Sequence, residues 1–254
     1  MKKIYILTLF PEYFTPLLKL GVVGQFLEGK RREVPPQIVL IDIRNFAQNK
    51  YKSVDDSPFG GGHGMVMRAD ILKRALVEGI LKVDSYKEED SYKELVKDNL
   101  HVVATTARGE VWKAEKAKEF AAFLTNDRSN KDLVFICGRY EGIDERFLKI
   151  YCHEEISLGD FILSGGEIAV LSILDSLLRF VPGVLGDINC AFEDSFEDNL
   201  LEAPKFTKPR LFEGIDVPSV YLSGHHSKIS LFEQEERKKM TALYRPDLIK
   251  NERK

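Results

Sequence analysis

Two segments rich in glycine lie close together in the sequence, and each follows a short apolar run. The first reads FICGRYEGIDER (135–146) and the second reads ISLGDFILSGGE (156–167). A short apolar run bounded by turn residues is typical of a buried strand, and helical periodicity follows each segment. Glycine accepts positive φ and allows a ligand to approach the backbone closely, so both segments are candidate binding loops. Open α/β sheets bind ligands at such loops, beyond the carboxyl ends of their strands.

The rest of the chain predicts strands that alternate with helices. Apolar, β-rich runs predict strands over 3–9, 37–43, 101–105, 133–137 and 155–158. Apolar positions at helical spacing, or compositions typical of helices, predict helices over 69–83, 112–124, 166–180, 227–243 and 246–250. The third of these helices is apolar on nearly all faces, so we expect it in the interior. This alternation favours an α/β fold with a mainly parallel sheet.

The chain is long enough for one large domain or two ordinary ones, with 254 residues. A stretch near its C-terminal end lacks clear periodicity and carries glycine, proline and many acids, which is typical of a linker. We therefore expect an α/β domain over 1–182, a flexible linker over 183–207 and a small helical domain over 208–254. The highly charged segment 84–98 is expected to be a surface insertion or an extended helix end.

Composition and charge narrow the class of protein. The chain is 44% hydrophobic and 30% charged, which fits a folded soluble protein rather than a disordered one. Its formal net charge of −3 argues against a generic polyanion binder. Residues 205–254 nevertheless hold eleven Lys and Arg against seven Asp and Glu. Such a basic tail permits contact with nucleic acid, although the charge alone favours an ordinary solvated helix surface.

The cysteines and the apolar runs point to a reducing, membrane-free setting. Cys137, Cys152 and Cys190 are widely spaced and form no C-x-x-C motif, so neither disulfides nor a structural zinc site is expected. The N-terminal residues lack the pattern of a signal peptide, and no apolar run reaches the length of a membrane span. We therefore expect a cytoplasmic protein without a membrane partner.

The sequence matches neither the P-loop motif nor the dinucleotide-binding motif. The segment GQFLEGK (24–30) comes close to a phosphate-binding P-loop, but Arg31 stands where Ser or Thr would hold magnesium. No G-x-G-x-x-G follows a strand, so a conventional dinucleotide site is not supported either. A third glycine-rich segment, DDSPFGGGHGM (55–65), could wrap around a flat ligand or be a mobile surface loop.

Six segments together resemble one family, the bacterial tRNA (guanine-N1) methyltransferases of the knotted SPOUT class. They are DDSPFGGGHGM, FICGRYEGIDER, ISLGDFILSGGE, DSLLRFVPGVLG, FEDSF and VPSVYLSGHH, and they occur in the order found in the family. One such motif would say little, but six in order are specific. The resemblance implies a SPOUT-type parallel sheet with a deep C-terminal trefoil knot and a small α-helical C-terminal domain. It also implies methyl transfer from S-adenosyl-L-methionine to N1 of guanosine 37, which lies 3′ of the tRNA anticodon.

The resemblance also assigns the residues that hold the cofactor. Most of them belong to the two glycine-rich loops, and many would bind through backbone groups. The implied cofactor-binding residues are Thr105, Gly138, Tyr140, Glu141, Leu158, Gly159, Asp160, Phe161, Ile162, Leu163, Gly165 and Gly166. Tyr140, Leu158 and Leu163 are expected to flank the adenine. Glu141 is also linked to Mg²⁺, on which family members depend.

The chemistry of the reaction explains the remaining assignments. A methyl group on a sulfonium is electrophilic, whereas guanine N1 is a poor nucleophile while it carries its proton. The site therefore needs a base at N1 and a donor for the charge on O6. The resemblance assigns the base to Asp194 and the O6 donor to Arg179. The resemblance also assigns contacts with the substrate to Asp55, Gly60, Gly61, Gly62 and Ser195. The residues alone do not separate Asp194 from neighbouring acids such as Asp198, which we expect to have no catalytic role.

The family further implies an obligate homodimer whose active sites are shared between protomers. Two alternatives are considered: a SPOUT methyltransferase acting on another RNA position, and a non-catalytic RNA-binding protein. A SPOUT methyltransferase acting on another RNA position would lack both the GGGHGM loop and the acid of the EDSF segment. A non-catalytic RNA-binding protein would not need an intact cofactor loop. The sequence departs from the usual family pattern at His63, Ala107, Phe192, His225 and the pair Phe232-Glu233. None of these positions lies among the expected cofactor or catalytic residues.

Overall fold

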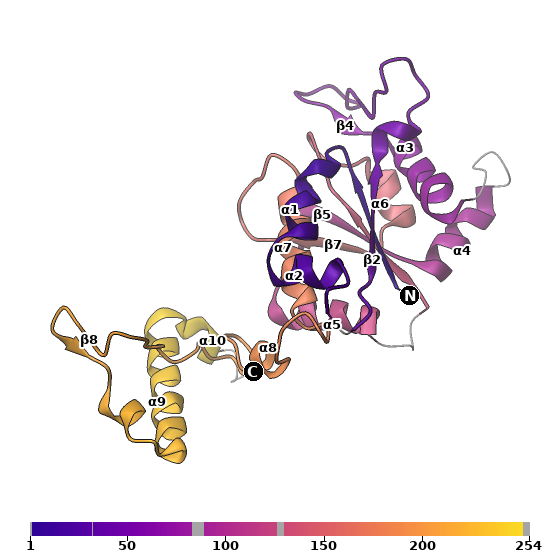
Figure 1. Cartoon of the computed structure of the whole chain (residues 1–254). Coiled ribbons are helices and arrows are strands. Elements are labelled where there is room, and N and C mark those ends of the chain that lie inside the picture. The colour runs from indigo at the N-terminus through magenta and orange to yellow at the C-terminus, as the bar shows by residue number, and fades with distance from the viewer. Residues whose placement is uncertain (1, 32, 83–88, 126–129, 251–254) are drawn as a thin grey trace. The chain divides into compact units, whose positions relative to one another are not determined.

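The computed structural model describes residues 2–31, 33–82, 89–125 and 130–250 (Figure 1). The chain divides into two compact units, Met1–Ile188 and Asn189–Lys254, which are described separately below. Most of the segment expected to be a linker, 183–207, groups with the second unit. None of the described helices is long and apolar enough to cross a membrane.

The first unit is built on a five-stranded parallel sheet. Its strands are β1 (Lys3–Thr8), β2 (Gln37–Asp42), β5 (Leu100–Val111), β6 (Asp132–Ile136) and β7 (Glu154–Ser157). They lie in the order β2-β1-β6-β5-β7, and all neighbouring pairs are parallel. The predicted α/β fold with a parallel sheet is therefore confirmed, and all five predicted strands are present.

Side chains alternate between two cores, one on each face of the sheet. On β1, Ile4 and Ile6 enter one core while Tyr5 and Leu7 enter the other. This period of two is the geometry of a strand. Because both faces are covered by helices, the central strands β1 and β6 are apolar almost throughout, as expected for a parallel sheet.

Helices cover both faces of the sheet (Figure 1). The first face holds η1 (Pro11–Phe14), α1 (Thr15–Lys19), α2 (Gly21–Leu27), α5 (Ala114–Thr125) and α7 (Gly166–Leu178). The second face holds η2 (Ile43–Phe46), α3 (Ala69–Arg74), η3 (Ala75–Leu81), α4 (Glu89–Asn99) and α6 (Glu145–Tyr151). Helix α7 is buried along most of its length, as its apolar composition predicts. A short antiparallel pair, β3 (Asp55–Asp56) and β4 (Val66–Met67), flanks the third glycine-rich segment.

Three local predictions need correction. The helix expected over 69–83 is α-helical only to Arg74 and continues as the π-helix η3, which ends at Lys82 in a left-handed conformation. The strand expected over 101–105 extends to Val111 after an irregularity in pairing. The charged segment 84–98 is not simply a surface insertion, because Tyr92 and Val96 of α4 are buried. Residues 84–88 lie outside the described part of the chain.

The second unit contains mostly helices. Its elements are α8 (Asn189–Phe192), β8 (Leu211–Phe212), β9 (Ile215–Asp216), η4 (Ser219–Leu222), α9 (His226–Tyr244) and α10 (Pro246–Lys250). The two predicted helices of this region match α9 and α10. The hairpin β8–β9 was not predicted, because its two-residue strands are too short to show alternation. Both turn residues, Glu213 and Gly214, have positive φ, as a tight hairpin turn requires.

Candidate active site

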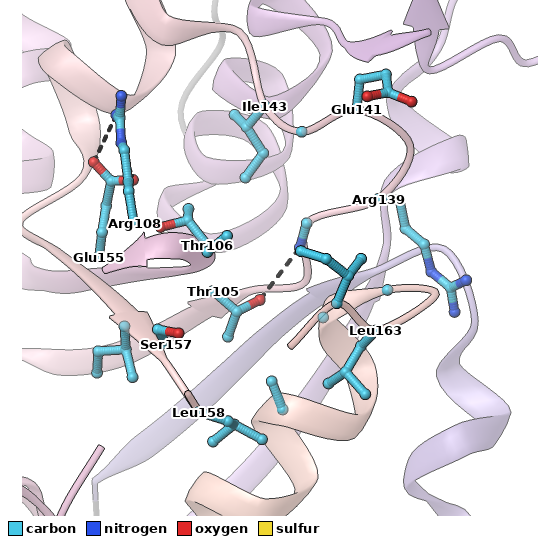
Figure 2. Close-up of a pocket in the computed structure, with 18 of the residues that line it drawn as sticks. Thr105, Thr106, Arg108, Arg139, Glu141, Ile143, Glu155, Ser157, Leu158 and Leu163 are labelled. Atoms are coloured by element: carbon cyan, nitrogen blue, oxygen red, sulfur yellow. Dashed lines mark hydrogen bonds and ion pairs between the residues drawn. The ribbon is translucent and has the colours of Figure 1, made fainter. Parts of the chain in front are cut away.

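A cavity of about 610 Å³ lies beside the irregular middle of β5 and beyond the carboxyl ends of β6 and β7 (Figure 2). Three segments form most of its wall: 105–108 on β5, 138–143 after β6, and 155–166, which includes the loop after β7. Both glycine-rich loops predicted to bind a ligand therefore line one cavity. This is the edge of the sheet at which α/β proteins bind small molecules, and the volume lies in the usual range for ligand pockets.

Ten of the twelve residues expected to bind the cofactor line this cavity. They are Thr105, Gly138, Tyr140, Glu141, Leu158, Phe161, Ile162, Leu163, Gly165 and Gly166. The other two, Gly159 and Asp160, belong to the same loop but do not line it. The sequence analysis did not single out Arg108, Glu145 and Glu155, which also line the cavity. Their pairing joins residues far apart in the sequence, so no local pattern marks it.

Close backbone approach explains two of the glycines. A Cβ at Gly166 would lie 2.1 Å from Oγ1 of Thr105, and one at Gly165 would lie 2.1 Å from Nε of Arg139. The backbone N–H of Gly166 donates to the carbonyl oxygen of Gly138 at 2.7 Å, which joins the two loops. A side chain at Gly165 would therefore displace Arg139 before it could affect a ligand in the cavity.

Arg139 fixes the second loop through a buried ion pair. Its Nε donates to Oε2 of Glu167 at 2.8 Å, and its Nη1 donates to the carbonyl oxygen of Ser164 at 2.9 Å. Glu167 is fully buried, and its Oε1 accepts a hydrogen bond from the hydroxyl of Thr8 at 2.8 Å. The guanidinium also lies 4.5 Å from the ring centroid of Phe10. The loop is thus attached to both α7 and the end of β1.

The opposite side of the cavity is held by a second arginine (Figure 2). Arg108 donates to both carboxylate oxygens of Glu155, at 2.9 and 2.7 Å, and pairs with Glu145 at 2.8 Å. The hydrogen bonds from Arg108 lower the pKa of Glu155. Thr105 and Glu110 both pair with Ile156, so the intervening residues form a bulge in β5 that Arg108 fastens to β7 and α6. This bulge forms one wall of the cavity.

The third glycine-rich segment adjoins the cavity through Glu141. The backbone N–H of Glu141 donates to the carbonyl oxygen of Met65 at 2.9 Å, and its side chain packs so closely that a Cβ at Gly64 would lie 2.4 Å from Cγ. Burial, and then the negative charge of Asp55, raises the pKa of Tyr140. The predicted substrate residue Asp55 pairs with Met67, whose N–H donates to the carbonyl oxygen of the cavity residue Gly142 at 2.9 Å. Gly60, Gly61 and Gly62 belong to the exposed loop between β3 and β4 and do not line the cavity.

No metal site is evident around Glu141. Within the described residues, no group of three or more His, Cys, Asp and Glu side chains could hold a metal ion. Glu145 and Glu155 also line the cavity, and both carboxylates pair with Arg108.

Arg179 and Asp194, the two predicted catalytic residues, are not among the residues that line the cavity. Arg179 caps the C-terminal end of α7, whose first residue, Gly166, lines the cavity. A helix of 13 residues spans about 20 Å, which is far more than the length of an arginine side chain. Asp194 belongs to the second unit, where the hydroxyl of Ser195 accepts a hydrogen bond from the N–H of Glu202 at 3.0 Å.

Comparisons with known proteins point to one family. A model of the family described as tRNA (Guanine-1)-methyltransferase TrmD matches residues 1–251. Proteins named tRNA (guanine-N(1)-)-methyltransferase from Mesorhizobium japonicum and Clostridioides difficile are each 39% identical to this chain. The first match covers 97% of this chain and 96% of the relative, and the second covers 98% and 97%. A relative of the same name from Leptothrix cholodnii is 41% identical over 96% of this chain and 90% of its own length.

The fold and the cavity define an α/β protein with a pocket for a small molecule beside its glycine-rich loops. The matched length and identity make the assignment more specific. The chain belongs to the tRNA (guanine-1)-methyltransferase TrmD family.

Proposed function

We propose that this chain transfers a methyl group from S-adenosyl-L-methionine to N1 of guanosine 37 in tRNA. The observation that carries the proposal is the single cavity formed by both glycine-rich loops in a chain matched along nearly its whole length by the family. The named relatives act on guanine N1, which favours this reaction over methylation elsewhere in RNA and over a non-catalytic role.

The cavity has the chemistry that S-adenosylmethionine requires. Leu158 and Leu163 supply apolar surface for an adenine, and the backbone groups of the glycine-rich loops supply hydrogen-bond donors and acceptors. Such a mixture, mostly apolar with a few fixed polar groups, is typical of cofactor pockets. When bound, the cofactor supplies an electrophilic methyl group on its sulfonium sulfur.

The residues of this chain prepare the guanine to accept that methyl group. Asp194 accepts the proton from guanine N1, and Arg179 donates hydrogen bonds to O6 as negative charge develops there. With its proton on Asp194, N1 would have a free lone pair to accept the methyl group that a bound cofactor would supply, and the carbon–sulfur bonding electrons would stay on the sulfur. A positioned base contributes about 10²–10⁴-fold to such a rate. A preorganised donor at O6 contributes about 10²–10³-fold.

The proposed active unit is a homodimer with shared sites. Arg179 lies at the far end of α7 from its own cavity, so it must serve the cavity of a second copy if it acts at O6. Exposed apolar side chains near the cavity, Phe161, Ile162 and Ile168, support an interface beside it. Two glycine-rich loops joined by the hydrogen bond from Gly166 to Gly138 also suit the proposed trefoil knot.

The proposal for Mg²⁺ rests on the family resemblance. Among the described residues, Glu141 belongs to no group of three or more side chains that could hold a metal ion. Mg²⁺ commonly binds through one or two carboxylates and keeps several waters. A loosely held ion at Glu141 would make activity depend on free Mg²⁺ concentration. The basic C-terminal tail would contact tRNA phosphates, and a cytoplasmic location follows from the proposed substrate.

A direct test is methyl transfer from labelled S-adenosylmethionine to tRNA. The proposal expects transfer to a tRNA with guanosine at position 37, and none to the same tRNA with adenosine there. Mapping the product should place the methyl group on N1. Equal transfer to both tRNAs, or a methyl group on a ribose, would contradict the proposed substrate.

A further inference from the structure

The acid proposed as the general base leads directly into a closed loop. In the loop 195–202, the N–H of Glu202 donates to the hydroxyl of Ser195 at 3.0 Å, and the N–H of Phe196 donates to the carbonyl oxygen of Leu200 at 2.8 Å. Asp194 immediately precedes this loop, and neighbouring Cα atoms are held about 3.8 Å apart. Whatever fixes Ser195 therefore limits where the backbone of Asp194 can lie.

Helix α9 holds this loop through Arg237. Its Nη1 and Nη2 donate to the two carboxylate oxygens of Asp198 at 2.9 and 2.5 Å, and its Nε donates to the carbonyl oxygen of Leu201 at 3.2 Å. One planar guanidinium thus contacts the loop at two points. Only arginine offers donors in this fixed arrangement.

Thr241 makes a second attachment one turn further along α9. Its hydroxyl accepts a hydrogen bond from the N–H of Leu201 at 2.8 Å and donates to the carbonyl oxygen of Arg237 at 2.7 Å. Residues four apart lie on the same face of a helix, so Arg237 and Thr241 present one surface to the loop. Thr241 is fully buried, and removing its hydroxyl would leave the N–H of Leu201 without this acceptor.

We infer that Arg237 is a positioning residue for catalysis, because it orients the loop that carries Asp194. This inference rests on the proposed role of Asp194 as the base. It also gives Asp198 a structural role, because Asp198 accepts hydrogen bonds from Nη1 and Nη2 of Arg237. A displacement of about 1 Å in a reacting group can lower a rate about 10²-fold, so loosening this loop affects the chemical step.

The competing explanation is that Arg237 contacts a tRNA phosphate, as the basic tail would suggest. The two explanations differ in what they expect of Asp198. A phosphate contact is unharmed, or even strengthened, when the neighbouring carboxylate is neutralised. A positioning contact is weakened by changing either partner, and lysine cannot replace arginine because it lacks the fork.

The test compares Arg237→Met, Arg237→Lys, Asp198→Asn and the double variant Arg237→Met/Asp198→Asn. Single-turnover methyl transfer is measured at saturating tRNA and cofactor, where the rate reports the bound state. We expect each single variant to be about 10- to 100-fold slower and the double variant to be no slower than Arg237→Met. Cofactor affinity should not change. The control is Arg74→Met, which removes the bidentate pair between Arg74, at the end of α3, and Glu78 of η3. Arg74 and Arg237 are similarly exposed, and this variant should keep the wild-type rate.

Hydrogen exchange of the free protein provides a readout that needs no activity. The amides of Phe196, Leu201 and Glu202 should exchange faster in Arg237→Met and Asp198→Asn than in wild type, whereas those of β6 should not. A wild-type rate in Asp198→Asn or Arg237→Lys would overturn the inference, and so would unchanged exchange in the loop. If wild type transfers no methyl group to tRNA, the proposed function fails instead, and the exchange comparison still decides whether Arg237 holds the loop.

Discussion

Replacing Arg139 with methionine should destabilise the protein strongly, because it leaves a buried charge without its main partner. Glu167 is fully buried and accepts hydrogen bonds at 2.8 Å from both Arg139 and Thr8. Removing one partner of a buried ion pair typically costs about 3–5 kcal/mol. The lost contact between the guanidinium and Phe10 adds about 0.5–2 kcal/mol. Together these effects are a large fraction of the stability of an ordinary domain, which is about 5–15 kcal/mol.

Denaturant unfolding of Arg139→Met, Glu167→Met and the double variant measures this effect. The double variant removes both charges, so it should be more stable than Arg139→Met, although it carries one more substitution. Cofactor affinity, measured by calorimetry, should fall in Arg139→Met because the carbonyl oxygen of Ser164 loses its donor and the loop loosens. The control is Arg108→Met, which breaks pairs on an exposed side chain and should reduce stability much less.

Two results would refute this reasoning. One is a loss of less than about 1 kcal/mol in Arg139→Met, which is the range of an exposed ion pair. The other is a double variant whose loss equals the sum of the two single losses. Additivity of this kind is expected only of residues that do not interact.

Three further predictions follow from the same structure. Asp194→Asn should lower the single-turnover rate by about 10²-fold or more with unchanged cofactor affinity by calorimetry, and a near-normal rate would exclude it as the base. Mixing equal amounts of Arg179→Ala and Gly165→Val protomers should restore about a quarter of the wild-type methyl-transfer activity if each site is shared, because half of the dimers are mixed and each mixed dimer has one intact site. No recovery of activity would indicate that each site lies within one chain. Hydrogen bonds from His101 and Lys116 lower the pKa of Glu154 from 4.5 to about 2. These bonds therefore stabilise the folded protein above pH 4.5, and the stabilisation is lost as the pH falls toward 2. Glu154→Gln should therefore be less stable than wild type near neutral pH, with the difference shrinking below pH 4.5 in denaturant unfolding, and a constant difference would contradict the assignment.

Local patterns predicted the strands and the loops because both are set by neighbouring residues. A buried strand such as β6 reads as a continuous apolar run, and the glycines that follow it mark the loop directly. The order of strands in the sheet is different. Pairing of β1 with β6 joins residues more than a hundred positions apart, and nothing in either run specifies the other.

The contacts that support the site could not be predicted from the sequence either, because they join residues that are far apart in the chain. Arg139 and Glu167 both stand in the quoted motifs, but their pairing spans 28 residues, and Arg237 and Asp198 are 39 apart. A signal for α4 was present, because Tyr92 and Val96 are spaced four apart like one face of a helix. The surrounding charges obscured it, and the segment was therefore expected at the surface.

The length of α7 is the strongest physical reason to expect two chains in one active site. Its first turn presents Gly166 to the cavity and buries Glu167 behind it, while its last turn ends at Arg179. The residues between are packed against the sheet, so the helix cannot bend to bring its two ends together without exposing the core. If Arg179 acts on the guanine, it must therefore reach the cavity of another copy. The mixed-protomer experiment tests this geometry directly, and it does so independently of any resemblance to a family.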